Sequence, residues 1–213
     1  MTNFIPIFPL NIVVYPGEEL NLHIFEPRYK QLITECHEAK KPFGIPTVIN
    51  NKLKDYGSLV EITELSKVHD NGEMDIRTRG VQIFRILELI REIPDKLYSG
   101  AIVNYPETND TGIPELMRKV IKSIRDLHQL LKLSKDFKKP DDQLRAYDVA
   151  HHIGLSLEEE YELLGLPDEK QRQEYLKRFL AKAIPMAVGM EQLKEKIKMN
   201  GHFKNLSGFD INL

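Results

Sequence analysis

The 213-residue chain has a single cysteine, no tryptophan and almost no net charge. Cys36 has no intramolecular partner, so a disulfide framework and a cysteine-rich zinc site are both excluded. The sequence has no uninterrupted apolar run of about eighteen residues, the length that could span a bilayer. Its first residues also lack the basic segment of a secretory signal. These absences predict a cytoplasmic protein that neither crosses a membrane nor leaves the cell.

The charge balance disfavours a nucleic-acid partner. The formal net charge is -2, with 12 Lys and Arg against 14 Asp and Glu before Pro106 and 18 against 18 after it. Proteins that bind nucleic acids neutralise phosphates with a cationic face, which neither half supplies as a whole. Sums over a domain do not show how charge is spread over its faces, but the lysine-rich stretch 135–139 is interpreted as a solvated loop.

The first half of the chain has mainly the hydrophobic period of β-strands. Ile12–Tyr15 are rich in β-branched residues and end at a Pro-Gly turn, and alternation continues over residues 20–24. The dipeptide Asn71-Gly72 predicts a hairpin with a type I′ turn. Further strands are expected over 43–49, 57–68, 74–78, 82–93 and 97–105.

One helix interrupts these strands. Pro27 stands at the expected first turn, and apolar side chains then recur at helical spacing as far as Cys36. Roughly six or seven strands with one inserted helix, and without repeated βα alternation, indicate a compact β barrel or sandwich.

The hydrophobic period changes after Pro106, where a segment rich in proline and polar residues is typical of a linker. A helix is expected from about Pro114, a second over 143–153, and a third from Ser156, whose spacing to Glu159 predicts a capping box. A fourth should follow Asp168, with a kink or break near Pro185. The predicted organisation is a β domain (1–106), a linker (107–114), a helical bundle (115–201) and a C-terminal tail (202–213).

A search for chemistry finds no catalytic motif, no metal site and no cofactor site. Phosphate-binding loops, dinucleotide fingerprints and serine-hydrolase elbows are absent from the sequence. Cys36 lies on the apolar face of the first helix and is predicted to be buried and structural. The adjacent pair His151-His152 cannot face one metal from a regular helix, so packing or capping is the favoured interpretation. Since active sites also assemble from residues distant in sequence, a hydrolase remains an alternative that only an assay of turnover would reveal.

Two motifs near the N-terminus resemble the start of the Lon protease N-terminal domain family. They are Phe8–Gly17, with its Pro-Leu-Asn and Pro-Gly elements, and Leu20–Tyr29, which reads LNLHIFEPRY. Further matches occur in the expected order, at Phe43-Gly44, Gly57-Ser58, Asp70-Asn71-Gly72, Arg79-Gly80 and Phe84-Arg85-Ile86. Within that family the chain looks most like the free-standing bacterial form, which has no ATPase or peptidase domain.

The resemblance implies an α+β fold, in which a PUA-like β pseudo-barrel with one inserted helix is followed by a C-terminal helical bundle. It also implies a non-catalytic module that recognises unfolded or exposed apolar polypeptide segments, with an apolar groove between barrel and bundle as a reasonable receptor. Expected partners are unfolded or partly folded polypeptides and a protease or chaperone, and a weak homodimer is a further expectation. Because PUA-like folds often bind RNA, an RNA-binding module is the alternative.

The candidate polypeptide-binding residues are five consecutive positions at a strand-to-helix junction, Phe25, Glu26, Pro27, Arg28 and Tyr29. A structural role competes with this interpretation. Phe25 and Tyr29 are equally compatible with the core, while Glu26 and Arg28 are compatible with bracing the junction.

Overall fold

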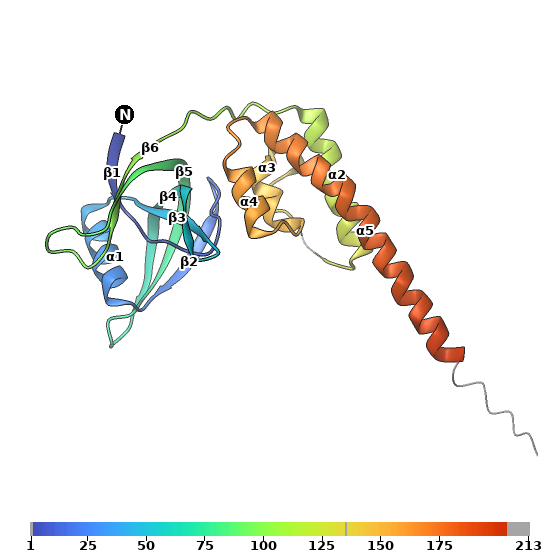
Figure 1. The fold of residues 1–213 in the computed structure, drawn as a ribbon, viewed down its shortest axis with the longest axis horizontal. Coiled ribbons are helices and arrows are strands. Elements are labelled where there is room, and N and C mark those ends of the chain that lie inside the picture. The colour runs from blue at the N-terminus through green and yellow to red at the C-terminus, as the bar shows by residue number, and fades with distance from the viewer. Residues whose placement is uncertain (1, 135, 204–213) are drawn as a thin grey trace, which may run out of the picture.

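The computed structural model describes residues 2–134 and 136–203. The first half of the chain forms an antiparallel sheet that closes on itself (Figure 1). Its path is β1-β6-β5-β4-β3, and β2 pairs with β5. The strands are β1 (Thr2–Pro6), β2 (Glu19–Ile24), β3 (Phe43–Ile49), β4 (Lys52–Val68), β5 (Met74–Ile90) and β6 (Gly100–Asn104).

The residues that follow β1 close the barrel. The backbone N–H of Phe8 donates to the carbonyl of Gly44 over 2.8 Å, and that of Val48 donates to Leu10 over 2.8 Å. These bonds join the two ends of the sheet path, because β1 lies at one end and β3 at the other. The expected β pseudo-barrel is therefore confirmed.

Helix α1 (Pro27–Ala39) packs on the barrel on the side away from the other helices (Figure 1). Its buried face is the predicted one, Tyr29, Leu32, Ile33 and Cys36. These side chains share a core with barrel residues such as Phe43 and Ile76. The inserted helix therefore supplies part of the interior of the β domain.

The second half of the chain is helical. Its main elements are α2 (Pro114–Leu130), α3 (Ala146–Val149), α4 (Leu157–Leu164) and α5 (Glu169–Phe203), with the short 3-10 turns η1 (Asp141–Gln143) and η2 (Ala150–His152). The predicted capping box at α4 is confirmed, since Glu159 N–H donates to Ser156 Oγ and Ser156 N–H donates to the Glu159 carboxylate. The bundle core continues into the barrel through Val13, Tyr15 and Ile83.

Three local predictions are wrong. Residues 12–15 do not form a strand, because side chains rather than a neighbouring strand satisfy part of their backbone: Ser58 Oγ donates to the Val14 carbonyl, and Tyr15 N–H donates to Glu18 Oε2 over 2.9 Å. Residues 143–153 form the short helix α3 and the 3-10 turn η2 instead of one continuous helix. There the extended Arg145 interrupts the helical backbone, and its N–H donates to the Asp148 carboxylate over 2.9 Å.

The third wrong prediction concerns the turn of the β4–β5 hairpin. The hairpin forms as expected, but its turn is not of type I′. A type I′ turn needs positive φ at both central residues, and in this turn only Gly72 has positive φ, at 75°. Gly72 N–H donates to His69 O and His69 N–H donates to Glu73 O, each over 2.8 Å. This pattern is a three-residue loop closed by a left-handed glycine.

Helix α5 does not break at Pro185, although a kink or a break was expected there. Proline removes one backbone hydrogen bond, and Pro185 is exposed, so water can reach the freed carbonyl. In Figure 1 the C-terminal part of α5 extends well beyond the other helices.

The segment expected to be a linker is attached to the bundle. Asn109 N–H donates to Pro167 O over 2.9 Å, and Glu169 N–H donates to Asn109 O over 2.8 Å. The domain limits themselves stay a prediction, and most of the expected tail, residues 204–213, lies outside the described residues. Among the helices described, none has both the length and the apolar character needed to cross a bilayer.

Candidate functional site

The junction that carries the five predicted binding residues is built from the end of β2 and the start of α1. Glu26 is extended and precedes the helix, and its carbonyl accepts the N–H groups of Tyr29 and Lys30. Pro27 occupies the first turn, where its missing N–H is not needed. The local sequence therefore fixes the angle at which α1 leaves the sheet.

Three of the five side chains brace this junction. Tyr29 is buried and stacks on Phe8 with ring centroids 3.9 Å apart. Arg28 bonds the Glu26 carboxylate through two nitrogens, at 2.8 and 2.7 Å, and lies over the Tyr29 ring at 4.5 Å. These contacts confirm the bracing role that the sequence offered as an alternative to binding. Bracing the junction does not prevent the same residues from contacting a ligand.

Phe25 behaves differently, because 58% of it is exposed. Its ring lies 6.2 Å from that of His23, centroid to centroid. A core role for Phe25 is therefore wrong, while a binding role for the five residues stays a prediction.

Two cavities flank α1, and both are lined by the same three segments: residues 3–9, α1 and residues 97–99. The smaller, of about 270 Å³, lies beside Arg28 and Tyr29 at the start of the helix. The larger, of about 460 Å³, lies beside Glu35, Cys36 and Ala39. We call these cavities and their walls the α1 surface.

The walls of the α1 surface are mainly apolar. Phe4 and Leu97 are 53% and 65% exposed, although both are large apolar side chains. Apolar side chains of such size in open cavities are typical of binding sites. The other apolar wall residues are Ile5, Pro6, Pro42, Tyr98 and Tyr105 around the larger cavity and Ile7, Pro9, Val48, Leu53 and Leu89 around the smaller.

Glu35 is a fixed negative charge in the wall of the larger cavity. Lys96 Nζ bonds both of its carboxylate oxygens at 2.8 Å, and Tyr98 OH donates to Oε2 over 2.5 Å. These bonds hold the pKa of Glu35 below its usual value, the one to Lys96 contributing most. They also tie α1 to the loop that carries Leu97.

Cys36 lines the same cavity, but its thiol is not activated. Burial raises the pKa of Cys36 to about 11. Since the thiolate is the nucleophilic form, this environment agrees with the structural role predicted for it.

The crevice between barrel and bundle, where an apolar groove was expected, has both apolar and charged walls, and a receptor groove there stays a prediction. Its two cavities, of about 470 and 330 Å³, are bordered by charged side chains that include Glu18, Lys139, Asp148 and Arg172. The apolar side chains of this interface, among them Val13 and Tyr15, are already buried against the bundle. The α1 surface, with Phe4 and Leu97 exposed in its walls, lies on the opposite side of the barrel (Figure 1).

Sequence reasoning found Arg28 and Tyr29 of the α1 surface but missed Phe4 and Leu97. The Leu20–Tyr29 motif pointed to the first pair. No sequence motif marks Phe4 or Leu97. Phe4 lies in β1, which pairs with β6, and Leu97 lies in the loop before β6.

This architecture defines a class of α+β domain in which a closed, mainly antiparallel barrel, packed by one inserted helix, carries a helical bundle. Within that class, the chain belongs to the family described as the ATP-dependent protease La (LON) substrate-binding domain, whose model matches residues 5–182.

Solved structures that share this fold include two Lon N-terminal domains. The Lon N-terminal domain protein from Xanthomonas campestris is 26% identical, with a TM-score of 0.64 over 83% of this chain and 98% of that one. The N-terminal domain of the Mycobacterium avium complex Lon protease is 14% identical, with a TM-score of 0.59 over 84% and 98%. The second shows the likeness of fold alone.

Proposed function

We propose that this chain is a non-catalytic module that binds exposed apolar segments of unfolded polypeptides at the α1 surface. The observation that carries the proposal is the pair of open, largely apolar cavities flanking α1, with Phe4 and Leu97 exposed in their walls. The family supports the same class of function, because its description is that of a substrate-binding domain.

The chemistry of the α1 surface suits ligands of varied sequence. Apolar contacts need little directional bonding, so side chains of many shapes can occupy the same cavities. The Glu35 carboxylate in the wall of the larger cavity is already bonded by Lys96 and Tyr98, so the apolar walls supply most of the contact with a ligand. Such a surface favours extended apolar segments of varied sequence.

The test compares one model protein in two states, permanently unfolded by reduction and alkylation, and natively folded. We expect saturable binding of the unfolded form and none of the folded form, measured by fluorescence anisotropy. Negligible binding of both forms would overturn the proposal. Release of peptide fragments from the unfolded form by the purified chain would overturn its non-catalytic part.

RNA binding is not favoured by the basic residues of this chain. In the lysine-rich stretch around 135–139, Lys138 pairs with Glu19 at 3.0 Å and Lys139 with Asp148 at 2.7 Å. Carboxylates therefore already neutralise these cations. A salt titration distinguishes the two functions, because phosphate contacts predict a steep loss of affinity with salt and apolar contacts do not.

A further inference from the structure

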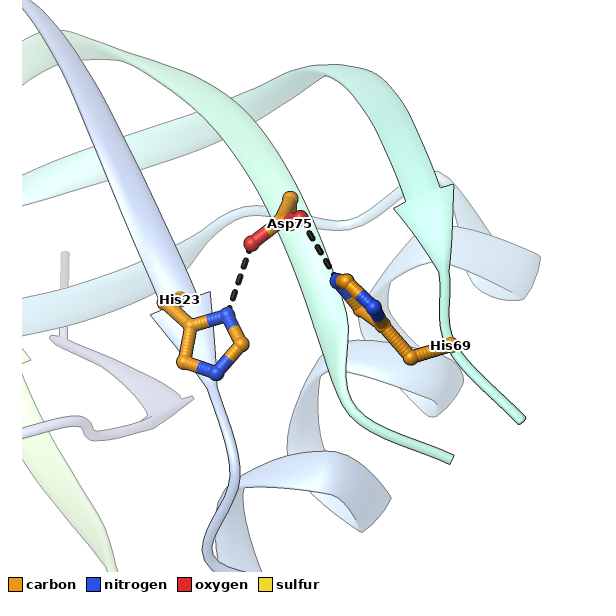
Figure 2. A group of neighbouring side chains, drawn as sticks. All are labelled: His23, His69 and Asp75. Atoms are coloured by element: carbon orange, nitrogen blue, oxygen red, sulfur yellow. Dashed lines mark hydrogen bonds and ion pairs between the residues drawn. The ribbon is translucent and has the colours of Figure 1, made fainter. Parts of the chain in front are cut away.

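Two histidines and two carboxylates meet at the tip of the β4–β5 hairpin, outside the α1 surface. Figure 2 shows three of these side chains, His23, His69 and Asp75. His23 Nδ1 bonds Asp75 Oδ1 at 2.7 Å, and His69 Nε2 bonds Asp75 Oδ2 at 2.8 Å. Glu73 Oε2 lies 3.2 Å from the other ring nitrogen of His23, Nε2. The sequence predicts no metal site, because these residues are distant in the chain and follow no ligand motif.

The barrel brings the ligands together by strand pairing. His23 on β2 lies directly opposite Asp75 on β5 in the antiparallel register. His69 follows the last residue of β4, and its N–H donates to Glu73 O, which closes the hairpin. The side chains therefore come from three segments whose backbones are already joined, so that the site is largely formed before any ligand binds.

We propose that His23, His69 and Asp75 form a binding site for a divalent transition metal of the Zn²⁺ class. One ligand atom from each residue lies within 4.8 Å of the others. Tetrahedral Zn²⁺, with bonds of about 2.0–2.2 Å, separates its ligands by roughly 3.3 Å. To reach that spacing the two His–Asp75 contacts of 2.7 and 2.8 Å must lengthen, which requires rotation of these partly exposed side chains.

The second carboxylate supports the same assignment. When a histidine binds a metal through one ring nitrogen, the other nitrogen usually donates to a carboxylate, which fixes the tautomer and the ring orientation. Glu73 is placed to accept from a protonated His23 Nε2, which favours the tautomer whose unprotonated Nδ1 would bind the metal in place of its present contact with Asp75.

The donor set also indicates which metals fit. Two imidazole nitrogens with one carboxylate favour Zn²⁺ and its neighbours over Mg²⁺ or Ca²⁺, which prefer oxygen ligands. His23, His69 and Asp75 are all partly exposed, so a fourth position remains open to water or to a side chain of a bound protein. A bound metal would fasten the hairpin tip to β2.

His151 shows why two carboxylates near a histidine are not enough to make a metal site. Its Nδ1 contacts Glu160 and its Nε2 contacts Glu18, at 2.7 and 3.1 Å. These carboxylates bind opposite edges of one ring, and within the described part of the chain they form no group of three potential metal ligands with His151. At the hairpin, by contrast, both histidines bond one carboxylate.

The experiment titrates the full chain, freed of metal by a chelator, with Zn²⁺ and separately with Mg²⁺, followed by calorimetry. We expect one equivalent of Zn²⁺ to bind and no Mg²⁺. His23→Ala and His69→Ala should each weaken Zn²⁺ binding by at least about tenfold. Even the loss of a residue that only hydrogen-bonds to a metal ligand commonly lowers metal affinity by about that factor. Glu73→Gln should cause a smaller loss, and His37→Ala, on the exposed face of α1, should cause none.

A second measurement does not depend on how the variants fold. Co²⁺ added to the wild-type chain should produce the visible absorption of a tetrahedral site, and Zn²⁺ should shift the NMR signals of two imidazole rings only. Absence of stoichiometric Zn²⁺ binding, equal affinity in the double variant His23→Ala/His69→Ala, or shifts at other histidines would overturn the proposal.

Discussion

Arg172 is 1% exposed, yet it carries a full positive charge. Its guanidinium bonds Glu169 at 3.0 Å and Asp110 at 2.7 Å, and it lies over the Tyr147 ring at 4.4 Å. Glu169 is also buried and accepts the N–H of Ala146 over 2.8 Å. This network joins the segment after β6 to α3 and α5, so one side chain holds three parts of the bundle together.

We expect Arg172→Met to destabilise the protein by about 3–5 kcal/mol, because it leaves the Glu169 charge buried without its partner. The free energy of unfolding, measured with urea, checks this. The double variant Glu169→Gln/Arg172→Met is the control. It should recover part of the lost stability, since no unpaired charge is then buried. Equal losses in the single and double variants would contradict this assignment.

Individual buried residues were predictable from sequence only where a period marks them. Tyr29 and Cys36 share a helical face, and both are buried as expected. Arg172 and Glu169 sit on a helix whose polar residues look solvated in sequence, and their partner Asp110 lies more than fifty residues away in a segment expected to be a linker. Such buried networks depend on tertiary contacts, which a local sequence pattern does not predict.

Strand β5 and the turn over residues 15–18 approach so closely that only glycine fits between them. Gly17 N–H donates to Gly80 O and Gly80 N–H donates to Glu18 O, each over 2.8 Å. A Cβ on Gly80 would overlap the carbonyl oxygen of Tyr15. The Arg79-Gly80 match to the Lon family therefore has a structural cause: it keeps this turn on the sheet.

We expect Gly80→Ala to destabilise the protein by about 1–3 kcal/mol, because the turn that carries Tyr15 must move away from β5. Thermal unfolding measures the effect. Gly189→Ala is the matched control, since its Cβ meets nothing within 4 Å and it lies inside α5. There alanine should stabilise the helix by about 0.5–1 kcal/mol, and a loss of stability at both positions would refute the close-approach explanation.

Elements were predicted best where the signal is local. The limits of α1, the capping box of α4 and the β4–β5 hairpin all follow from short motifs. Residues 12–15 were misassigned because β-branched residues signal burial as well as strand pairing, and here the buried backbone finds side-chain partners. The hairpin turn type was misjudged because Asn-Gly also suits a three-residue loop.

At the scale of the whole molecule, His151 links the barrel to the bundle. It bonds Glu18, just before β2, and Glu160 on α4. Burial works against the charged imidazole, but the hydrogen bonds to Glu160 and Glu18 outweigh it and raise the pKa of His151 to about 10. The histidine is therefore a cation at neutral pH, held between two carboxylates.

This link predicts a pH dependence of stability. The pKa of His151 is raised on folding from its ordinary 6.5 to about 10, so its contribution is complete below pH 6.5 and is lost as pH rises toward 10. We expect the free energy of unfolding of the wild type, relative to His151→Gln, to decrease between those values. A difference independent of pH in urea unfolding would show that the charged pairing contributes nothing.

Leu97 is the exposed apolar residue that most directly tests polypeptide binding at the α1 surface. Leu97→Asp places a charge in the wall of the smaller cavity, whereas Leu87→Asp makes the same change at a leucine of β5 that is 53% exposed and lines neither cavity. The decisive measurement is the affinity of both variants for the reduced, alkylated model protein. We expect Leu97→Asp to weaken binding at least about tenfold, roughly 1.4 kcal/mol, and Leu87→Asp to bind like the wild type. Equal affinities of the two variants would contradict a polypeptide site at the α1 surface.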